Sequence, residues 1–290
     1  MSWDEESETA VAEKVEKYVP LADGIHRDAS FENYLKQDRV SKSLLWDTFD
    51  RSPAHARQGK EESNAMKIGT ATHCVLLEPD MFRARFVRGP DDRRGNKWKD
   101  ALAVAASDGR DLLTAGDYDS ALMLRDVVKD MAYIKKLTGN GAYREITACA
   151  TDPDTGLKTR MRADAYVPGD GILIDLKTTA DARPEPFMRS VRNFGYHLQE
   201  AHYSRTWSLA GGASVAFLFV VVEPEAPFAV KIYELDPDTV AEGEAIRQRA
   251  MATWAECVAA GAWPSYSQEP EVIGLRKFDY KMTVPMMGGN

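Results

Sequence analysis

The stretch from Arg160 to Thr179 reads RMRADAYVPGDGILIDLKTT and predicts the centre of the fold. Two apolar segments within it, Met161 to Val167 and Gly171 to Leu176, have the composition of β-strands. The Pro-Gly-Asp-Gly sequence at 168–171 is a strong turn signal between them. These features together predict a β-hairpin.

The second predicted strand carries charged residues. Side chains alternate along a strand, so Asp175 and Lys177 share one face while Ile174 and Leu176 point into apolar packing. An acid and a lysine beside a core-like run cost desolvation energy unless a charged group is bound there. The hairpin can place Asp164 beside Asp175, and two close carboxylates repel unless a hard divalent cation offsets their charge. The stretch therefore predicts a Mg²⁺ or Mn²⁺ site with a lysine next to it.

An acid on one strand followed by acid-x-Lys on the next resembles the PD-(D/E)-x-K nuclease superfamily. The resemblance implies an α/β, restriction-endonuclease-like core, in which helices flank a central mixed β-sheet. It also implies that Asp164, Asp175 and Lys177 are catalytic and that the two aspartates hold the metal. Ala163 departs from the proline of the motif, at a position that varies in this superfamily. Short acid-x-Lys strings also occur by chance on solvated strand edges, so the motif alone leaves both interpretations open.

Composition limits the class of protein. The 290 residues, 44% hydrophobic and 28% charged, are typical of a soluble globular protein with a full core. A formal net charge of −8 argues against a protein that coats nucleic acid, although a local basic channel remains compatible. Three scattered cysteines, Cys74, Cys149 and Cys257, fit neither a disulfide framework nor a Cys-x-x-Cys metal site. They also cannot supply the four cysteines of similar Cas4-like nucleases.

The ends of the chain and its hydropathy predict location and domain organisation. Residues 1–30 are acid-rich and are predicted to form a frayed or partly helical N-terminal arm, with 31–290 as a single nuclease domain. No apolar run approaches the ~20 residues of a membrane helix. The acidic N-terminus lacks the form of a signal peptide. We therefore expect a cytoplasmic protein of a bacterial host, without membrane contact.

A helix is predicted after Val40, because apolar residues at 44–49 recur at helical spacing and Ser41 suits the N-cap. Pro53 predicts that the helix ends near Ser52. An amphipathic core helix explains this pattern by itself. The functional alternative is that Ser41, Lys42 and Ser52 present donors to a DNA phosphate at a helix end.

The segment KIGTATHCVLLEP, residues 67–79, predicts a second helix that opens at Gly69-Thr70 and carries His73. A lone histidine on an apolar helix is usually a satisfied core residue. However, SKSLLWDTFDRSPAH, this segment and the hairpin resemble, in order and spacing, the nuclease domain of exonuclease VIII-type (RecE-like) enzymes from phage-derived recombination systems. In that family, and in the related RecBCD nuclease domain, the histidine of the GTxxH helix ligates the metal. The resemblance implies the same role for His73.

A basic loop supplies further candidate residues, and a strand and a turn extend the predicted hairpin. The basic loop RGPDDRRGNKWK at 88–99 suits DNA contact through Arg93, Arg94, Lys97 and Trp98, and suits an ordinary solvated loop equally well. A strand at 142–150 and a turn at 152–156 extend the hairpin to a three-stranded antiparallel meander.

Glu145 lies on the first strand of this meander. It is a candidate second-metal or water-mediated ligand, and the alternative is cross-strand pairing with Arg160 or Arg162. Arg162 and Thr178 complete the candidate DNA contacts.

The C-terminal half is predicted to alternate helices and strands. Residues 98–106 and 115–137 are predicted helices, as is the amphipathic stretch 187–209, followed by strands at 215–222 and 229–235 and a helix at 239–260.

Within 187–209, Tyr196, Gln199 and Tyr203 fall at i, i+3 and i+7 on one helical face. A polar-tipped core edge explains that face. The Gln-x-x-x-Tyr pair also resembles the signature of RecB-type nucleases, which implies that Gln199 and Tyr203 are catalytic.

The resemblance implies a metal-dependent exonuclease that degrades linear double-stranded DNA 5′ to 3′, processively, leaving 3′ single strands for recombination by an annealing protein. One or two Mg²⁺ or Mn²⁺ ions would be held by His73, Asp164, Asp175 and the main-chain carbonyl of Leu176, while Lys177 orients the attacking water. Related enzymes form rings, which implies a homo-oligomer, a trimer or a tetramer. The alternatives are a RecB/Cas4-like nuclease with single-strand or endonuclease activity, and a non-catalytic DNA-end-binding module.

Overall fold

The protein is built around a six-stranded mixed sheet with strand order β1-β4-β5-β6-β7-β8. The computed structural model describes residues 18–59, 63–270, 272 and 273. Neighbouring strands are antiparallel except for β6 and β7, which are parallel. The strands are β1 (Gly24–His26), β4 (Tyr143–Thr151), β5 (Lys158–Val167), β6 (Ile172–Thr178), β7 (Ala216–Val222) and β8 (Val230–Tyr233).

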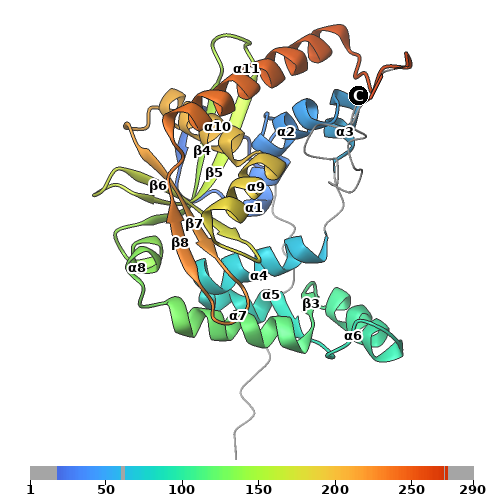
Figure 1. The fold of residues 1–290 in the computed structure, drawn as a ribbon, viewed down its shortest axis with the longest axis vertical. Coiled ribbons are helices and arrows are strands. Elements are labelled where there is room, and N and C mark those ends of the chain that lie inside the picture. Colours follow the sequence, from blue (N-terminus) through green and yellow to red (C-terminus); the bar gives the residue numbers. More distant parts are fainter. Residues whose placement is uncertain (1–17, 60–62, 271, 274–290) are drawn as a thin grey trace, which may run out of the picture.

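Helices cover both faces of this sheet (Figure 1). One face packs against α4 (Asn64–Leu77), α7 (Ala115–Val128) and α8 (Ala132–Thr138) in one apolar cluster. The opposite face packs against α9 (Pro184–Phe194) and α10 (Tyr196–Leu209) in a second cluster. Two further helices, α2 (Lys42–Asp50) and α11 (Pro237–Ala260), pack on α10. The predicted α/β class, a mixed sheet flanked by helices, is confirmed.

Smaller elements complete the described part of the chain. They are α1 (Phe31–Lys36), α3 (Pro53–Gln58), the 3₁₀-helix η1 (Pro79–Met81), α5 (Phe82–Arg85), β2 (Phe86–Arg88), α6 (Asn96–Ser107) and β3 (Asp111–Leu113). Strands β2 and β3 form a separate two-stranded parallel sheet. Within the described ranges, no helix combines the length and the apolar character needed to cross a membrane.

The predicted meander is confirmed. Strands β4, β5 and β6 are consecutive and antiparallel, and residues 168–171 connect the last two. The β5–β6 register pairs Val167 with Ile172 and Ala165 with Ile174. Strand β6 then continues beside β7, where Asp175 pairs with Phe219. The predicted helix N-cap at Ser41 is also confirmed, since its side chain accepts a hydrogen bond from the Leu44 amide.

Two predicted helices are each divided in the structure. The helix expected at 187–209 is interrupted at Gly195, which has φ 64°. A Cβ at this position would lie 2.2 Å from the Trp46 ring, so only glycine fits between α9 and α10. The helix expected at 115–137 is α7 and α8, separated at residues 129–131. The break lets α7 pack on α4 while α8 packs on β5.

Two other boundaries also differ from the prediction. Helix α4 begins at Asn64 rather than at Gly69, because Ser63 caps it by accepting a hydrogen bond from the Met66 amide. Gly69 lies inside the helix, where an added Cβ would stand 3.4 Å from Thr178 Oγ1. Residues 24–26, expected in a frayed or partly helical arm, form strand β1 and pair with β4. Residues 1–17 lie outside the described residues, so the arm beyond β1 stays a prediction.

Candidate active site

The central feature of the site is the point where β5 and β6 stop pairing. Their regular register ends at Ala165 and Ile174, one residue before the two aspartates would oppose each other. There the Asp164 side chain takes the place of a main-chain carbonyl as hydrogen-bond acceptor. Its Oδ2 accepts a hydrogen bond from the Leu176 amide at 2.5 Å. The carbonyl of a strand residue lies on the same edge as its amide. The Leu176 carbonyl therefore lies on the Asp164 side of β6.

The other neighbour of Asp164 is also irregular. Glu145 stands opposite Asp164 in the β4–β5 register, and its φ of 52° interrupts the pairing between the Arg144 and Ile146 rungs. A non-glycine residue with positive φ is uncommon, and such residues concentrate at functional sites. The main chain is thus distorted on both sides of the Asp164 carboxylate.

Asp175 and Lys177 lie on the same face of β6, as strand alternation predicts. Lys177 Nζ lies 2.5 Å from Asp175 Oδ2, and Gln199 on α10 donates from Nε2 to Asp175 Oδ1. The Lys177 ammonium also lies 4.5 Å from the centroid of the Tyr196 ring. The helical face predicted to carry Tyr196 and Gln199 therefore packs over the acid and the lysine.

His73 reaches the site from α4, on the other helical layer. Its Nδ1 lies 3.4 Å from Asp164 Oδ1. Burial lowers the pKa of His73, but the Asp164 carboxylate outweighs that effect and the pKa is raised. Helix α4 is seated against β6 one turn earlier, where Gly69 approaches Thr178. The small residue lets the helix come close enough for the imidazole to reach the acid.

The two aspartates differ in their electrostatics. Burial raises the pKa of Asp164, but His73 offsets it and the pKa is lowered overall. Burial also raises the pKa of Asp175, where the neighbouring Asp164 charge adds to it and Lys177 only partly offsets it. For Lys177, burial lowers the pKa and the Asp175 carboxylate outweighs it, so the ammonium form is favoured. The site therefore favours an ionised Asp164 and a charged Lys177, and makes the Asp175 charge costly.

Tyr203 and Glu145 complete the surroundings of the acids. Burial raises the pKa of Tyr203 well above its usual 10.0, and both aspartates add to this, so its hydroxyl stays protonated. Glu145 Oε2 lies 2.7 Å from Arg162 Nε, which confirms the alternative of cross-strand pairing. Burial and the Asp164 charge raise the pKa of Glu145, so it also faces the site electrostatically.

The donors fit a hard divalent ion in their chemistry. Asp164 and Asp175 are 9% and 4% exposed, and Asp175 Oδ2 is paired with the Lys177 ammonium. Carboxylates, a carbonyl and an imidazole form a set that suits Mg²⁺ or, with the imidazole, Mn²⁺. Within the described residues, however, no three His, Cys, Asp or Glu side chains are gathered as a finished metal cluster. Asp175 instead contacts Lys177 on its own strand and Gln199 on α10.

Comparison with known proteins agrees with this geometry. Residues 43–275 match a family described as a PDDEXK-like domain of unknown function, DUF3799. The chain belongs to this PDDEXK-like family. The restriction-endonuclease-like fold predicted from the hairpin is thereby confirmed, and the finding supports a nuclease.

Two solved structures that match this chain are named as exonucleases. A candidate exonuclease from Eubacterium rectale is 14% identical with a TM-score of 0.58, and the match covers 88% of this chain and 99% of that one. A phage-related exonuclease from Haemophilus somnus 129PT is 12% identical with a TM-score of 0.33, and the match covers 80% and 100%. The first likeness shows the fold. A search of curated proteins found no match.

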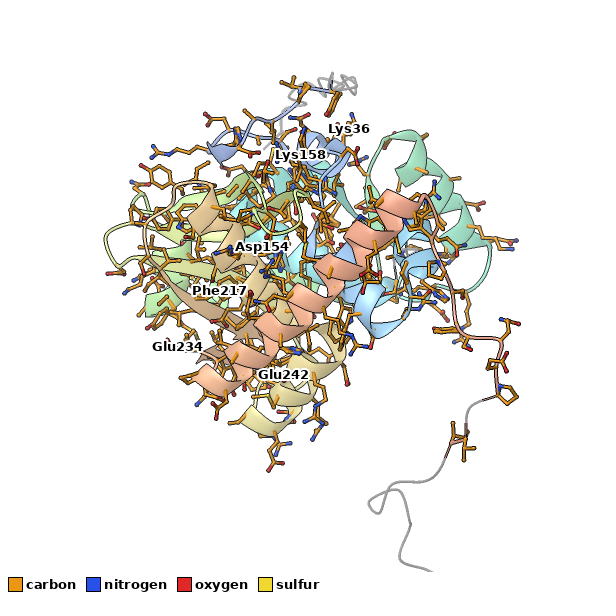
Figure 2. The ribbon with its side chains drawn as sticks, turned by 90° about the horizontal axis from the view of Figure 1, so that it is seen from above. Lys36, Asp154, Lys158, Phe217, Glu234 and Glu242 are labelled. Atoms are coloured by element: carbon orange, nitrogen blue, oxygen red, sulfur yellow. The ribbon has the colours of Figure 1, made fainter. Side chains whose placement is uncertain are left out.

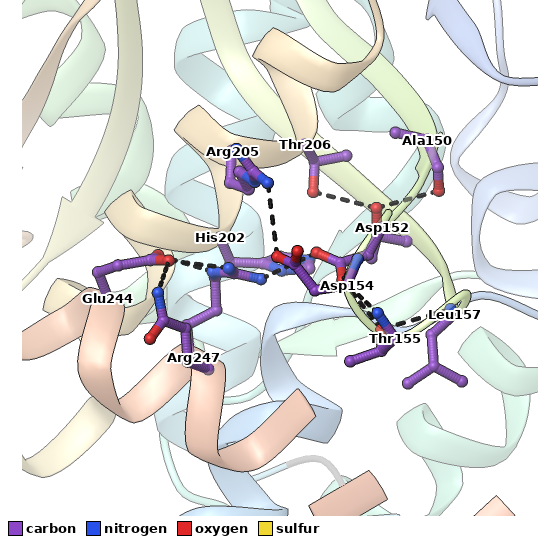
Figure 3. Close-up of polar contacts among 12 residues, drawn as sticks. Ala150, Asp152, Asp154, Thr155, Leu157, His202, Arg205, Thr206, Glu244 and Arg247 are labelled. Carbon is purple, nitrogen blue, oxygen red and sulfur yellow. Dashed lines mark hydrogen bonds and ion pairs between the residues drawn. The ribbon is translucent and has the colours of Figure 1, made fainter. Parts of the chain in front are cut away.

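A buried polar cluster holds α10 of the PDDEXK-like domain against the meander (Figure 3). Arg247 on α11 pairs with Glu244 at 2.7 Å and with Asp152 at 3.4 Å. His202 Nε2 lies 3.0 Å from the Arg160 carbonyl of β5. The His202 contact fixes α10, the helix that carries Gln199, against β5, and the Arg247 pairs fix α11 to the turn after β4. The sequence analysis missed it, since charged residues far apart in the chain carry no local signal.

The candidate DNA-binding residues fall in two regions. Ser41 and Ser52 cap α2 and α3, and Ser52 is buried, so both serve the helix termini in this structure. Lys42 Nζ donates to the Phe194 carbonyl. Arg162, besides Glu145, binds the Ala29 carbonyl.

The basic loop near α6 is bound to acids. Arg93 pairs with Asp117 at 2.9 Å and Arg94 with Asp92 at 2.9 Å. Lys97 is exposed on the first turn of α6. Trp98 lies 5.8 Å from the Arg93 guanidinium. Figure 1 places α6 at the outer end of the helical layer, away from the centre of the sheet. Roles in DNA binding for this loop and for Ser41, Lys42, Ser52, Arg162 and Thr178 stay predictions.

Proposed function

We propose that this PDDEXK-like protein is a Mg²⁺- or Mn²⁺-dependent deoxyribonuclease that hydrolyses phosphodiester bonds. The observation that carries the proposal is the meeting of Asp164, Asp175, Lys177 and His73 from three elements at the point where β5 and β6 part. Buried carboxylates beside a lysine are costly to maintain in a purely structural role. A bound cation and a phosphate would offset those charges.

Asp164, Asp175, His73 and the Leu176 carbonyl would hold the metal. A bound divalent ion lowers the pKa of water toward neutrality and offsets negative charge on the phosphate. Asp164, kept ionised by His73, supplies a fixed negative ligand. Asp175 becomes available when its carboxylate turns from Lys177 and Gln199.

Lys177 is the proposed electrostatic catalyst. Asp175 keeps its ammonium charged, and the Tyr196 ring limits its movement. In this position it donates hydrogen bonds to the attacking water and to the phosphate oxygens as negative charge builds. Gln199 orients Asp175, and the protonated hydroxyl of Tyr203 is a further donor on the same helical face.

The finer proposal concerns the substrate. The order of motifs resembles exonuclease VIII-type enzymes, so we propose 5′ to 3′ processive digestion of linear duplex ends that leaves 3′ single strands for an annealing protein. A homo-oligomeric ring, a trimer or a tetramer, is part of the same proposal, as is a role in phage-derived recombination.

The test is digestion of end-labelled linear duplex with Mg²⁺, with Mn²⁺ and with EDTA, beside nicked-circular and single-stranded DNA. We expect mononucleotide release from 5′-labelled linear duplex with metal and none with EDTA. Asp164→Asn should abolish release, and Glu242→Gln, an exposed change on α11, should not. Cleavage of circles would replace the exonuclease assignment with an endonuclease. Binding of ends without product release under any metal would leave only a DNA-end-binding module.

A further inference from the structure

A second site candidate lies on the outer side of α10. A pocket of about 700 Å³ opens between α10, the edge of β7 and the first turns of α11. Gln199 and Tyr203 face the acids, whereas Glu200 and Ser204 follow them by one residue and are turned by about 100° around the helix. Glu200 and Ser204 line this pocket. It is therefore separate from the catalytic face.

The pocket is acidic at its rim and apolar at its base. Phe217 and Leu235 are buried apolar residues that line it. Three further acids, Glu234, Asp236 and Glu244, lie around them, and Figure 2 shows Phe217 and Glu234 near the start of α11. None of the described residues that line the pocket carries a positive charge.

Glu200 is the acid without a compensating contact. Asp236 caps α11 by accepting from the Thr239 amide, and Glu244 is paired with Arg247. Glu200, in contrast, is only 8% exposed, and its Oε2 accepts no hydrogen bond. An unsatisfied buried carboxyl oxygen costs about 1–3 kcal/mol or more, so such groups ordinarily have a partner.

The electrostatics of Glu200 favour a positively charged ligand. Burial raises the pKa of Glu200 to about 8, and the neighbouring Glu234 carboxylate adds to that effect. A positive charge placed between the two carboxyl groups would stabilise the ionised form of Glu200 and offset the repulsion from Glu234.

We propose that this pocket, defined by Glu200, Ser204, Phe217, Glu234 and Leu235, docks a basic side chain of a partner protein. The aliphatic stem would lie on Phe217 and Leu235, and the charged group would bind Glu200 and Glu234. Arginine matches this best, because its planar guanidinium binds two carboxylates at once and is weakly hydrated. Since this chain has a formal net charge of −8, a more basic partner is favoured over a second copy.

The test titrates the full-length protein with N-acetyl-arginine-methylamide and follows the methyl resonances of Val215 and Leu235 by NMR. The matched probe is N-acetyl-citrulline-methylamide, in which a neutral urea replaces the guanidinium. We expect saturable shifts with the arginine probe and none with citrulline. Glu200→Gln should weaken binding about tenfold or more, since a charge-assisted hydrogen bond is lost.

Two further variants serve as controls. Glu234→Gln changes an exposed rim residue and should also weaken binding of the arginine probe without affecting folding. Glu242→Gln, on α11 outside the pocket, should leave binding unchanged. Glu200→Gln should digest DNA like the wild type, so this proposal and the nuclease proposal fail independently.

Several outcomes would overturn the proposal. Equal binding of the citrulline probe, or unchanged binding by Glu200→Gln, would remove the charge argument. If Glu242→Gln weakened binding of the arginine probe as much as Glu200→Gln, the effect would come from the net negative charge of the protein and not from the pocket. Displacement of the probe by Mn²⁺, with paramagnetic broadening of the pocket methyls, would assign the pocket to a metal ion. A changed oligomeric state of Glu200→Gln in sedimentation would assign it to a second copy.

Discussion

Replacing Lys177 with methionine removes one charge from the site with little change in side-chain volume. The ammonium lies 2.5 Å from Asp175, and the two side chains are 16% and 6% exposed. Breaking one side of a buried ion pair costs about 3–5 kcal/mol, a large part of the 5–15 kcal/mol that stabilises a typical domain. For a chain of this size, the expected fall in Tm is on the order of 10 °C.

This loss should depend on pH in a direction set by Asp175. Burial already raises its pKa, and removing Lys177 raises it further. The folded state then binds the proton more tightly than the unfolded state, whose aspartate pKa is about 3.9. Relative to the wild type, the stability loss of the variant should therefore be smallest at low pH and grow as the pH rises above that value. Denaturant unfolding in EDTA from pH 5 to pH 8 measures this trend.

A double-mutant cycle separates the ion pair from general damage. Asp175→Asn combined with Lys177→Met removes both charges, so its loss should be much smaller than the sum of the two single losses. Mg²⁺ should restore part of the stability of Lys177→Met, by about 2.7 kcal/mol at a hundredfold excess over its Kd. It should not restore turnover, which we expect to fall about 10²–10³-fold. Wild-type stability of Lys177→Met at pH 7 in EDTA, or near-normal turnover, would refute the reasoning.

Three other changes test separate parts of the structure. Gly195→Ala should lower the free energy of unfolding by about 2–4 kcal/mol, because the residue has a positive φ and a Cβ would contact Trp46. Gly261→Ala, at φ 62° with open space around it, should lower it less. Comparable unfolding midpoints for the two variants would contradict this. Burial lowers the pKa of His202 to about 4. The contribution of His202 to the stability of the wild type should therefore fall by about 3 kcal/mol as the pH drops from 7 to 4. His202→Gln should make stability depend less on pH over this range. Tyr196→Leu should lower kcat while DNA affinity persists, and Tyr196→Phe should retain activity because the ring supplies the cation contact; equal loss in both variants would assign the effect to the hydroxyl.

The local parts of the site were predictable from the sequence because they depend on short-range geometry. Strand alternation places Asp175 and Lys177 on one face whatever surrounds them, and the turn at 168–171 returns the chain along a hairpin. Helical periodicity likewise aligned Gln199 with Tyr196. The role of His73 came from a resemblance rather than from periodicity, since an apolar helix with one histidine is compatible with ordinary core packing.

Other features were decided only by tertiary structure, because they depend on contacts between distant segments. The break at Gly195 follows from the approach of Trp46, and the start of α4 at Asn64 follows from a serine cap that the predicted boundary overlooked. The capture of the Asp175 carboxylate by α10 likewise needed the folded chain.

The sequence by itself determined that a paired-acid and lysine motif lies on a hairpin within an α/β chain, because alternation and turn chemistry act over a few residues. Only the tertiary structure decided which helices meet that hairpin, how the strands part at Asp164, and that the Glu200 carboxyl group is buried. Burial and the charges of distant neighbours set these properties, and neither is encoded in local spacing.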